Sequence, residues 1–479
     1  MVNEFAVLML LGAASVSLAW LLKLRNFWLL FPAGLMGVIT IRALTFSAVN
    51  LFNQRNWANP VFYAILFAVV IAAAWVGKKV MYQSLWLAVS LGFASAFATR
   101  ILNFTTLPDA DSLWTLSVTR LFDQGSNLNK LADETSMQRG FAYPLMLSLG
   151  EPREFLTGFT PMLFAALICA AIWALTTLAR IRRSGRPALF VIAILMALVS
   201  ASSVMVLKTI FYINSHNLSA IAFLLSVTAI AIAMRTGEIS VETRSVLSIS
   251  LATASFSSQE AIVFSTLILM PLVSREWLRR RDLILLACSI SVPYLVWLAT
   301  YNPLFVKMTG VPPWLFVALI LGVVLFVTWL IANLPRELRK HVIWATPALL
   351  VLILLVCWLV AGKQMATSFE ALFQVLFTGA GDWGSLPYLI CAGFGLLLLT
   401  GLKNWSEEFK SLAWSLATLI LGALVLKTFA TNPQGEVFIR KLAWADNLNR
   451  LLFELLTIAL ITLVVGFAQR RETGLLANE

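Results

Sequence analysis

Two aspartates that lie two residues apart, Asp109 and Asp111, have the residue type and spacing for acid–base chemistry. A carboxylate beside a hydroxyl can remove its proton, and two neighbouring carboxylates could also share a divalent cation such as Mg²⁺ or Mn²⁺. Aspartate directly after a turn residue, as in Pro108-Asp109, is also common at the start of a helix. The pair therefore predicts either a general base or a helix cap.

Three cationic side chains in or beside polar segments could hold a phosphate, namely Arg139, Lys208 and Arg450. The two arginines are the stronger candidates, because a guanidinium binds phosphate oxygens in pairs and keeps its charge. Simpler interpretations stay open. Arg139 could be a solvated loop charge, and Arg450 could extend from a helix end to the membrane interface.

Other polar residues interrupt apolar sequence, where an ionisable group is costly and usually has a partner or faces a cavity. Gln259 and Glu260 lie between two short apolar pieces and are predicted to contact a substrate or organise its pocket. Arg42 is isolated inside an apolar stretch, and we expect it to pair with a carboxylate that supports folding. Glu454 would pair with Arg450, which lies one helical turn away.

The chain has two histidines, and His216 is the one in a segment that we predict to be external. It is a candidate pocket residue, although a turn or cap role is the more common use of histidine in such a polar run. No cluster of histidines, cysteines and acids has metal-ligand spacing, so no metal site is assigned.

The chain that must position these residues has 479 residues, of which 60% are hydrophobic and only 12% charged, with a mean hydropathy of +0.87. A soluble domain carries about 25% charged residues, so ordinary soluble, disordered and collagen-like classes are excluded. The four cysteines lie inside apolar runs and give no sign of a disulfide framework. The composition predicts an all-α polytopic membrane protein.

Apolar stretches long enough to cross about 30 Å of hydrocarbon recur along the whole sequence. Two shorter apolar pieces lie between 245 and 273 and are hinged at 257–260. Together they predict about 13–15 transmembrane helices. The predicted full-length spans are 5–22, 28–52, 58–77, 83–100, 157–179, 187–207, 215–234, 283–300, 314–333, 342–361, 386–402, 411–427 and 448–468.

The net charge of +12 is distributed unevenly between alternate loops. Most of the lysines and arginines fall in one set of loops, and short basic loops stay cytoplasmic. We therefore expect the N-terminus outside and the C-terminus inside, in a bacterial inner membrane, with membrane lipids rather than nucleic acid around the protein. The longest polar segment, 101–156, is then external, and its part near 108–125 is predicted to form an amphipathic helix at the membrane interface.

The order of several motifs extends this interpretation. An acid and an amphipathic helix that ends at Gly125 precede the run Arg139-Gly140-Phe141-Ala142-Tyr143-Pro144-Leu145. The run Thr253-Ala254-Ser255-Phe256-Ser257-Ser258-Gln259-Glu260 follows, and Asn449-Arg450-Leu451-Leu452-Phe453 opens the last span. This series resembles the first external loop, the broken helix pair and the late external arginine of the GT-C superfamily. The resemblance covers about 101–300, with a further match near the C-terminus.

The resemblance implies an inverting glycosyltransferase that moves a sugar from a polyprenyl-phosphate donor to a lipid or glycan acceptor of the cell envelope. An aspartate would be the general base, and spacing back from Thr119-Arg120 favours Asp111 over Asp109. Four spans precede this acid, whereas the family usually has one. The donor phosphate would be held by Arg139, Arg450 and Lys208, and the pocket would include Tyr143, His216, Gln259 and Glu260.

The predicted organisation has four parts: N-terminal helices at 1–100, the external loop at 101–156, a GT-C-like core at 157–300 and C-terminal helices at 301–479. Two other functions remain open. An O-antigen-type polymerase or ligase would act on diphosphate-linked glycans, but its large external loop usually lies nearer the C-terminus. A lipid or solute transporter would suit the span count, but only one clear helix break is present.

Overall fold

The computed structural model describes the parts of the chain that form most of the bundle. Within them every regular element is helical. The described residues are 2–51, 55–77, 83, 86, 119, 141–150, 152–179, 203–206, 216–257, 259–300, 322, 333, 335–379, 381–399, 405–430 and 442–476.

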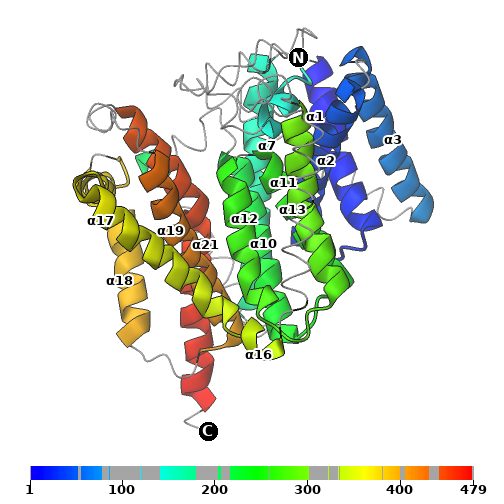
Figure 1. Cartoon of the computed structure of the whole chain (residues 1–479). Coiled ribbons are helices and arrows are strands. Elements are labelled where there is room, and N and C mark those ends of the chain that lie inside the picture. The colour runs from blue at the N-terminus through cyan, green and yellow to red at the C-terminus, as the bar shows by residue number, and fades with distance from the viewer. Residues whose placement is uncertain are drawn as a thin grey trace.

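The helices follow one another along the chain from α1 near the N-terminus to α21 near the C-terminus (Figure 1). A 3-10 turn, η1 (Arg55–Trp57), precedes α3. The helices are α1 (Val2–Leu21), α2 (Phe27–Leu51), α3 (Ala58–Val76), α6 (Ala142–Leu147), α7 (Pro152–Leu178), α10 (His216–Thr236), α11 (Val241–Ser257), α12 (Gln259–Val273), α13 (Arg280–Thr300), α16 (Arg336–Arg339), α17 (Val342–Phe377), α18 (Leu386–Leu399), α19 (Glu407–Ala430) and α21 (Leu442–Leu476).

Seven described helices are long and apolar enough to cross a membrane, so the expectation of an all-α membrane protein is confirmed. These seven match predicted spans, whereas the predicted spans 83–100, 187–207 and 314–333 lie largely outside the described residues. The total of about 13–15 helices therefore stays a prediction. The seven are Phe27–Asn50, Ala58–Val76, Phe159–Leu178, His216–Thr236, Val342–Val360, Glu407–Val425 and Leu451–Gln469.

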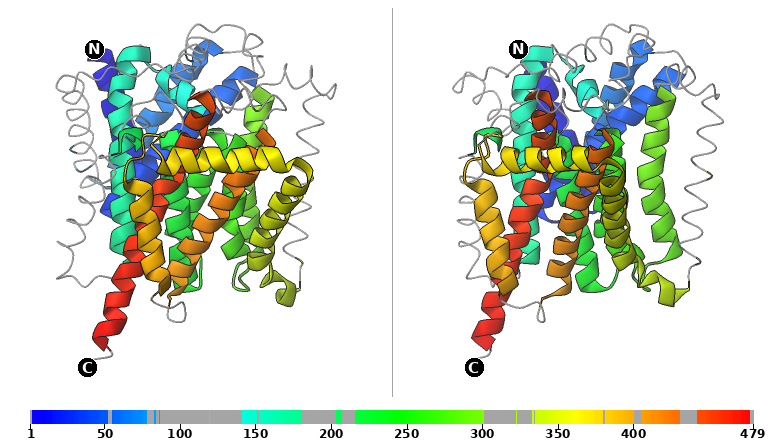
Figure 2. Two further views of the ribbon diagram at one scale, coloured as in Figure 1. Left: turned by 90° about the vertical axis from the view of Figure 1, so that its left-hand side faces the viewer. Right: turned by 60° about the vertical axis from the view of Figure 1, so that its left-hand side comes forward.

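The helices run up and down between two ends of the bundle (Figures 1 and 2). We call the end at which α10 and α12 begin the upper end, and the end at which α11 and α13 begin the lower end. Of the segment predicted to be external, residues 141–150 and the start of α7 are described, and they lie at the upper end. The described basic connections 235–244 and 274–281 lie at the lower end, where α11 and α13 begin.

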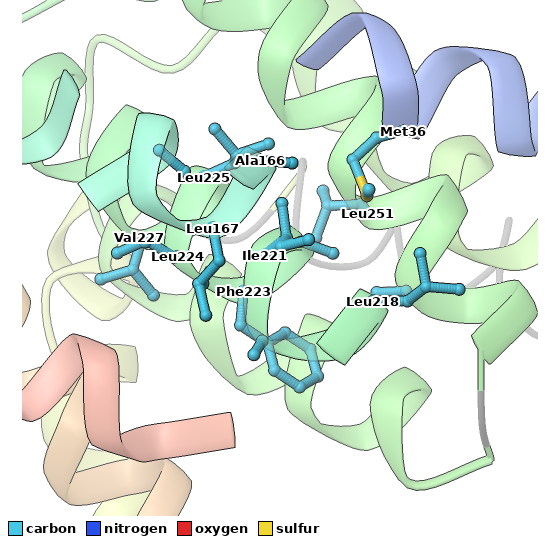
Figure 3. Close-up of a cluster of buried hydrophobic side chains, with 14 of the residues drawn as sticks. Met36, Ala166, Leu167, Leu218, Ile221, Phe223, Leu224, Leu225, Val227 and Leu251 are labelled. Carbon is cyan, nitrogen blue, oxygen red and sulfur yellow. The ribbon is translucent and has the colours of Figure 1, made fainter. Parts of the chain in front are cut away.

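Helix α10 is the core of the bundle. In its most apolar stretch 94% of the residues are buried, the highest share among the seven candidate spans. It packs against α7, α11, α12, α19 and α21. Figure 3 shows Ile221 and Phe223 of α10 among Leu167 of α7 and Leu251 of α11. A helix that is apolar on all sides is covered either by other helices or by lipid. Helix α10 is covered by other helices, and His216 is the first residue of this central helix.

Helices α11 and α12 are too short to cross a membrane alone. At 1.5 Å per residue, their 17 and 15 residues span about 26 and 22 Å, less than the ~30 Å hydrocarbon core. Helix α11 ends at Ser257 and α12 begins at Gln259, which confirms the predicted break. In Figure 1 the upper end of α12 lies below the upper end of α7.

Ion pairs connect helices at the lower end. Arg244 at the start of α11 is 2.8 Å from Asp282 of α13, measured between Nη2 and Oδ1. Arg235 at the end of α10 is 3.8 Å from Glu408 of α19, and its Nη1 donates a hydrogen bond of 2.8 Å to the carbonyl of Thr177. Both carboxylates are buried. These ion pairs give two buried acids oppositely charged partners at the lower end of the bundle.

Candidate functional site

The candidate residues fall into three groups. Outside the described residues lie Asp109, Asp111, Arg139 and Lys208. On described helices, but with side chains outside the described part, lie Gln259 and Glu260 at the start of α12 and Arg450 on α21. Described in full are Tyr143 and His216. All the candidates whose backbone is described belong to elements at the upper end of the bundle.

A histidine–carboxylate contact joins two helices at this end. Nδ1 of His216, the first residue of α10, lies 2.6 Å from Oε1 of Glu454 on α21. The Glu454 side chain is 3% exposed and that of His216 is 19% exposed. At this distance a protonated ring nitrogen donates to a carboxylate, and such a bond fixes the tautomer and orientation of the ring. The contact therefore fixes the orientation of the His216 imidazole at the start of α10, the central helix.

Glu454 is a functional candidate that the sequence alone did not identify. The sequence offered Arg450 as its partner, because the two are four residues apart, and the structure adds His216, which is 238 residues away. The Arg450 side chain lies outside the described part, so its pairing with Glu454 stays a prediction. One signal was available: both residues begin spans that were predicted to start on the same side of the membrane. Because both spans were predicted to start on the same side of the membrane, a contact between the two residues was possible, but this did not identify the pair.

The segment after Arg139-Gly140 is buried, although the sequence placed it in the external loop. Helix α6 (Ala142–Leu147) has all six residues buried and packs against α2, α7 and α11. Phe141, just before this helix, contacts Phe256 of α11 with ring centroids 5.4 Å apart. Because Phe256 lies three residues before Gln259, this contact brings the Arg139 motif toward the break between α11 and α12.

Tyr143 is part of the core beside this break. Its side chain is 1% exposed, and its ring packs against Phe159 of α7 at 6.0 Å between centroids. Burial raises the pKa of Tyr143, so its phenol stays neutral. The hydroxyl lies near Thr160, but no hydrogen bond of ordinary geometry reaches it from the described residues. These surroundings favour a structural role for Tyr143 over contact with a substrate.

Arg42 anchors the segment that follows α6, and the expectation of a carboxylate partner is wrong for the described residues. Its guanidinium donates to the carbonyls of Ala58 and Leu145, to the side-chain oxygen of Asn59 and to the hydroxyl of Ser148. Its Cζ also lies 5.1 Å from the ring centre of Phe62. Neutral oxygens can replace the expected acid because the guanidinium has five N–H donors, and carbonyl, amide and hydroxyl oxygens all accept from them. One side chain therefore ties α2, α3 and α6 together.

The arrangement brings together motifs that are far apart in the sequence. Helix α10 packs against both α12 and α21, and the His216–Glu454 contact places the start of α10 against α21. Helix N-termini carry a partial positive charge that favours anions. The upper end thus combines a fixed imidazole with helix ends that suit a phosphate. For a divalent cation, the two acids that could share it lie outside the described residues.

Comparison with known proteins found no relative of this chain. No family model matches the chain, and no curated protein or solved structure matches it.

Proposed function

We propose that the protein is a membrane glycosyltransferase that uses a polyprenyl-phosphate sugar as donor and works at the upper, external face of the membrane. The observation that carries the proposal is the contact between His216 and Glu454. It joins the start of α10 to the motif around Arg450, in the same bundle in which the Phe141–Phe256 contact links the Arg139 motif to the α11–α12 break. Motifs whose order resembles the GT-C superfamily thus belong to elements that meet.

The reaction needs little covalent help from the protein. Asp111 removes the proton from an acceptor hydroxyl, whose oxygen attacks the anomeric carbon of the sugar with inversion. The bond between this carbon and the phosphate oxygen breaks, and the polyprenyl phosphate leaves with the electron pair. Arg139 and Arg450 neutralise the charge that grows on the phosphate. A phosphate is a good leaving group, so no proton donor is required.

His216 and Glu454 have a positioning role in this proposal. The carboxylate holds the imidazole in one orientation, and the ring then offers one hydrogen bond to the donor phosphate or the acceptor. The positive ends of α10 and α12 favour an anion in the same region. A site of this kind requires polar groups that are available at one face of the membrane, whereas the two buried acids at the lower end, Asp282 and Glu408, are bound by arginines.

The test is sugar transfer by purified protein in liposomes with a panel of polyprenyl-monophosphate sugars. We expect transfer from at least one donor, and a loss of about 10²-fold or more in Asp111→Asn, the range for removal of a general base. Asp109→Asn should retain most activity. Glu454→Gln should lower kcat, whereas Glu238→Gln, an exposed lower-end change of the same chemistry, should have no effect.

Other results would redirect the assignment. Full activity in both aspartate variants would overturn the base assignment and leave the donor class intact. No transfer from any monophosphate donor would overturn the proposed function. Consumption of a diphosphate-linked oligosaccharide would then indicate the polymerase or ligase. Movement of lipid across the membrane without sugar transfer would indicate a transporter.

A further inference from the structure

Helix α17 is longer than a membrane span. Its 36 residues would extend about 54 Å if straight, nearly twice the ~30 Å hydrocarbon core. Figure 2 shows that the helix bends: its first half rises from the lower end, and its second half runs across the bundle near the upper end. Near the middle of α17 the sequence changes from an apolar run to Gly362-Lys363-Gln364. The sequence predicted a span at 342–361 and an external segment after it, but the helix continues to Phe377.

The first half of α17 has the surface of a lipid-facing helix. Only 6% of its most apolar stretch, Val342–Val360, is buried. Leu355 is 56% exposed and Leu359 84% exposed. Trp414 of α19 donates a hydrogen bond of 2.8 Å to the carbonyl of Ile343, so this half packs on one side and exposes the rest.

The second half has three different sides. Met365 and Val375 are buried against the protein, whereas Phe369 and Phe373 are 39% and 58% exposed. At about 100° per residue, the exposed polar residues lie roughly 60–100° round the helix from Phe373. These polar residues are Lys363, Glu370 and Gln374. An exposed surface that is aromatic along one edge and polar along the next suits the boundary between hydrocarbon and water.

Ring contacts connect this half to the first half of α17 and to α18. The ring of Phe369 lies 6.3 Å from that of Trp358, which belongs to the lipid-facing half. At the other end the hydroxyl of Tyr388 on α18 donates a hydrogen bond to the carbonyl of Phe377, and the two rings are 5.1 Å apart. The exposed aromatic edge is therefore continuous with the lipid-facing surface of the preceding span.

We propose that the second half of α17 lies in the plane of the membrane at the upper interface and binds the lipid layer through Phe369 and Phe373. The lipids of the upper leaflet cover this exposed aromatic edge, at the boundary between their acyl chains and their headgroups. Lys363, Glu370 and Gln374 face the aqueous side, where Gln374 donates a hydrogen bond of 3.2 Å to Glu370. The inference is independent of sugar transfer.

The test measures lipid and water access at neighbouring positions. Single cysteines replace Phe369, Glu370, Phe373 and Gln374 in a variant whose four native cysteines, Cys169, Cys288, Cys357 and Cys391, are changed to alanine. Each is labelled with a nitroxide in liposomes, and its accessibility to oxygen and to a water-soluble nickel chelate is measured. Leu352→Cys on the lipid-facing half and Glu337→Cys at the lower end provide the hydrocarbon and water references.

We expect the oxygen-to-nickel accessibility ratio to be several-fold higher at 369 and 373 than at 370 and 374. All four positions are exposed, so labels there should not disturb packing, and unchanged thermal unfolding of each labelled protein confirms this. Equal access to water at all four positions would overturn the proposal, since the helix would then lie above the membrane. Equal lipid access would also overturn it, because the polar edge would be immersed.

Discussion

Nδ1 of His216 and Oε1 of Glu454 lie 2.6 Å apart across the packed surfaces of α10 and α21. The Glu454 side chain is almost fully buried, as are those of Asp282 and Glu408, two acids at the lower end that have arginine partners. Arginine keeps its charge and binds the lower-end carboxylates in ion pairs. The buried acid of the upper end is instead held by an imidazole, the side chain that we propose to contact the substrate.

The first prediction concerns the strength of this contact. In a double-mutant cycle with His216→Ala and Glu454→Gln, we expect a coupling energy of about 1 kcal/mol or more, because the two groups are close and largely desolvated. The control is Lys410→Ala with Glu407→Gln, an exposed pair 3.1 Å apart, for which about 0.5 kcal/mol or less is expected. Reversible unfolding in mixed micelles supplies the free energies. Equal coupling in both pairs would contradict the importance of the upper contact.

The second prediction concerns Arg42. Arg42→Lys should lower the free energy of unfolding by about 2–4 kcal/mol, because lysine cannot reach the carbonyls of Ala58 and Leu145 together and leaves buried acceptors unsatisfied. Arg281→Lys is the matched control, since the Arg281 side chain is 67% exposed, and its effect should stay within about 0.5 kcal/mol. Unfolding in detergent measures both. Similar values for the two variants would show that the hydrogen bonds of Arg42 are dispensable.

The third prediction concerns the approach of α1 to α2. A Cβ added at Gly34 would lie 1.8 Å from the carbonyl oxygen of Ser15, so Gly34→Ala must separate the two helices. We expect a large loss of folded protein on size-exclusion chromatography. Gly395→Ala on α18 meets no atom within 4 Å and should be neutral or slightly stabilising, because alanine favours helix over glycine. Normal yield of Gly34→Ala would mean that α1 and α2 pack less closely than described.

Hydropathy alone predicted the seven membrane-spanning helices, because a long apolar run needs no knowledge of its neighbours. The break at 257–260 was also visible, since polar residues divide two runs that are each too short to span. The extension of α17 to Phe377 was missed. Polar residues after Gly362 resemble a loop in sequence, whereas an in-plane helix needs only one apolar edge.

The candidate site was harder to predict, because its contacts join residues that are far apart. No signal in the sequence singled out His216 as a partner of Glu454, and the isolated position of Arg42 suggested a carboxylate partner although neutral oxygens fill that role. The burial of α6 was hidden for a related reason. A six-residue apolar segment inside a polar loop becomes buried only when α2, α7 and α11 close around it.

The last prediction tests which end of the bundle is outside. In the variant that lacks native cysteines, Ser385→Cys lies at the upper end and Glu238→Cys at the lower end, both on exposed connections. Basic loops remain cytoplasmic, so a membrane-impermeant maleimide should label Ser385→Cys in intact cells and Glu238→Cys only after permeabilisation. Labelling of both after permeabilisation is the control for reactivity. The reverse pattern would put the His216–Glu454 contact on the cytoplasmic side and remove the external site from the proposed reaction. It would leave the α10–α21 packing unchanged, because that contact does not depend on orientation.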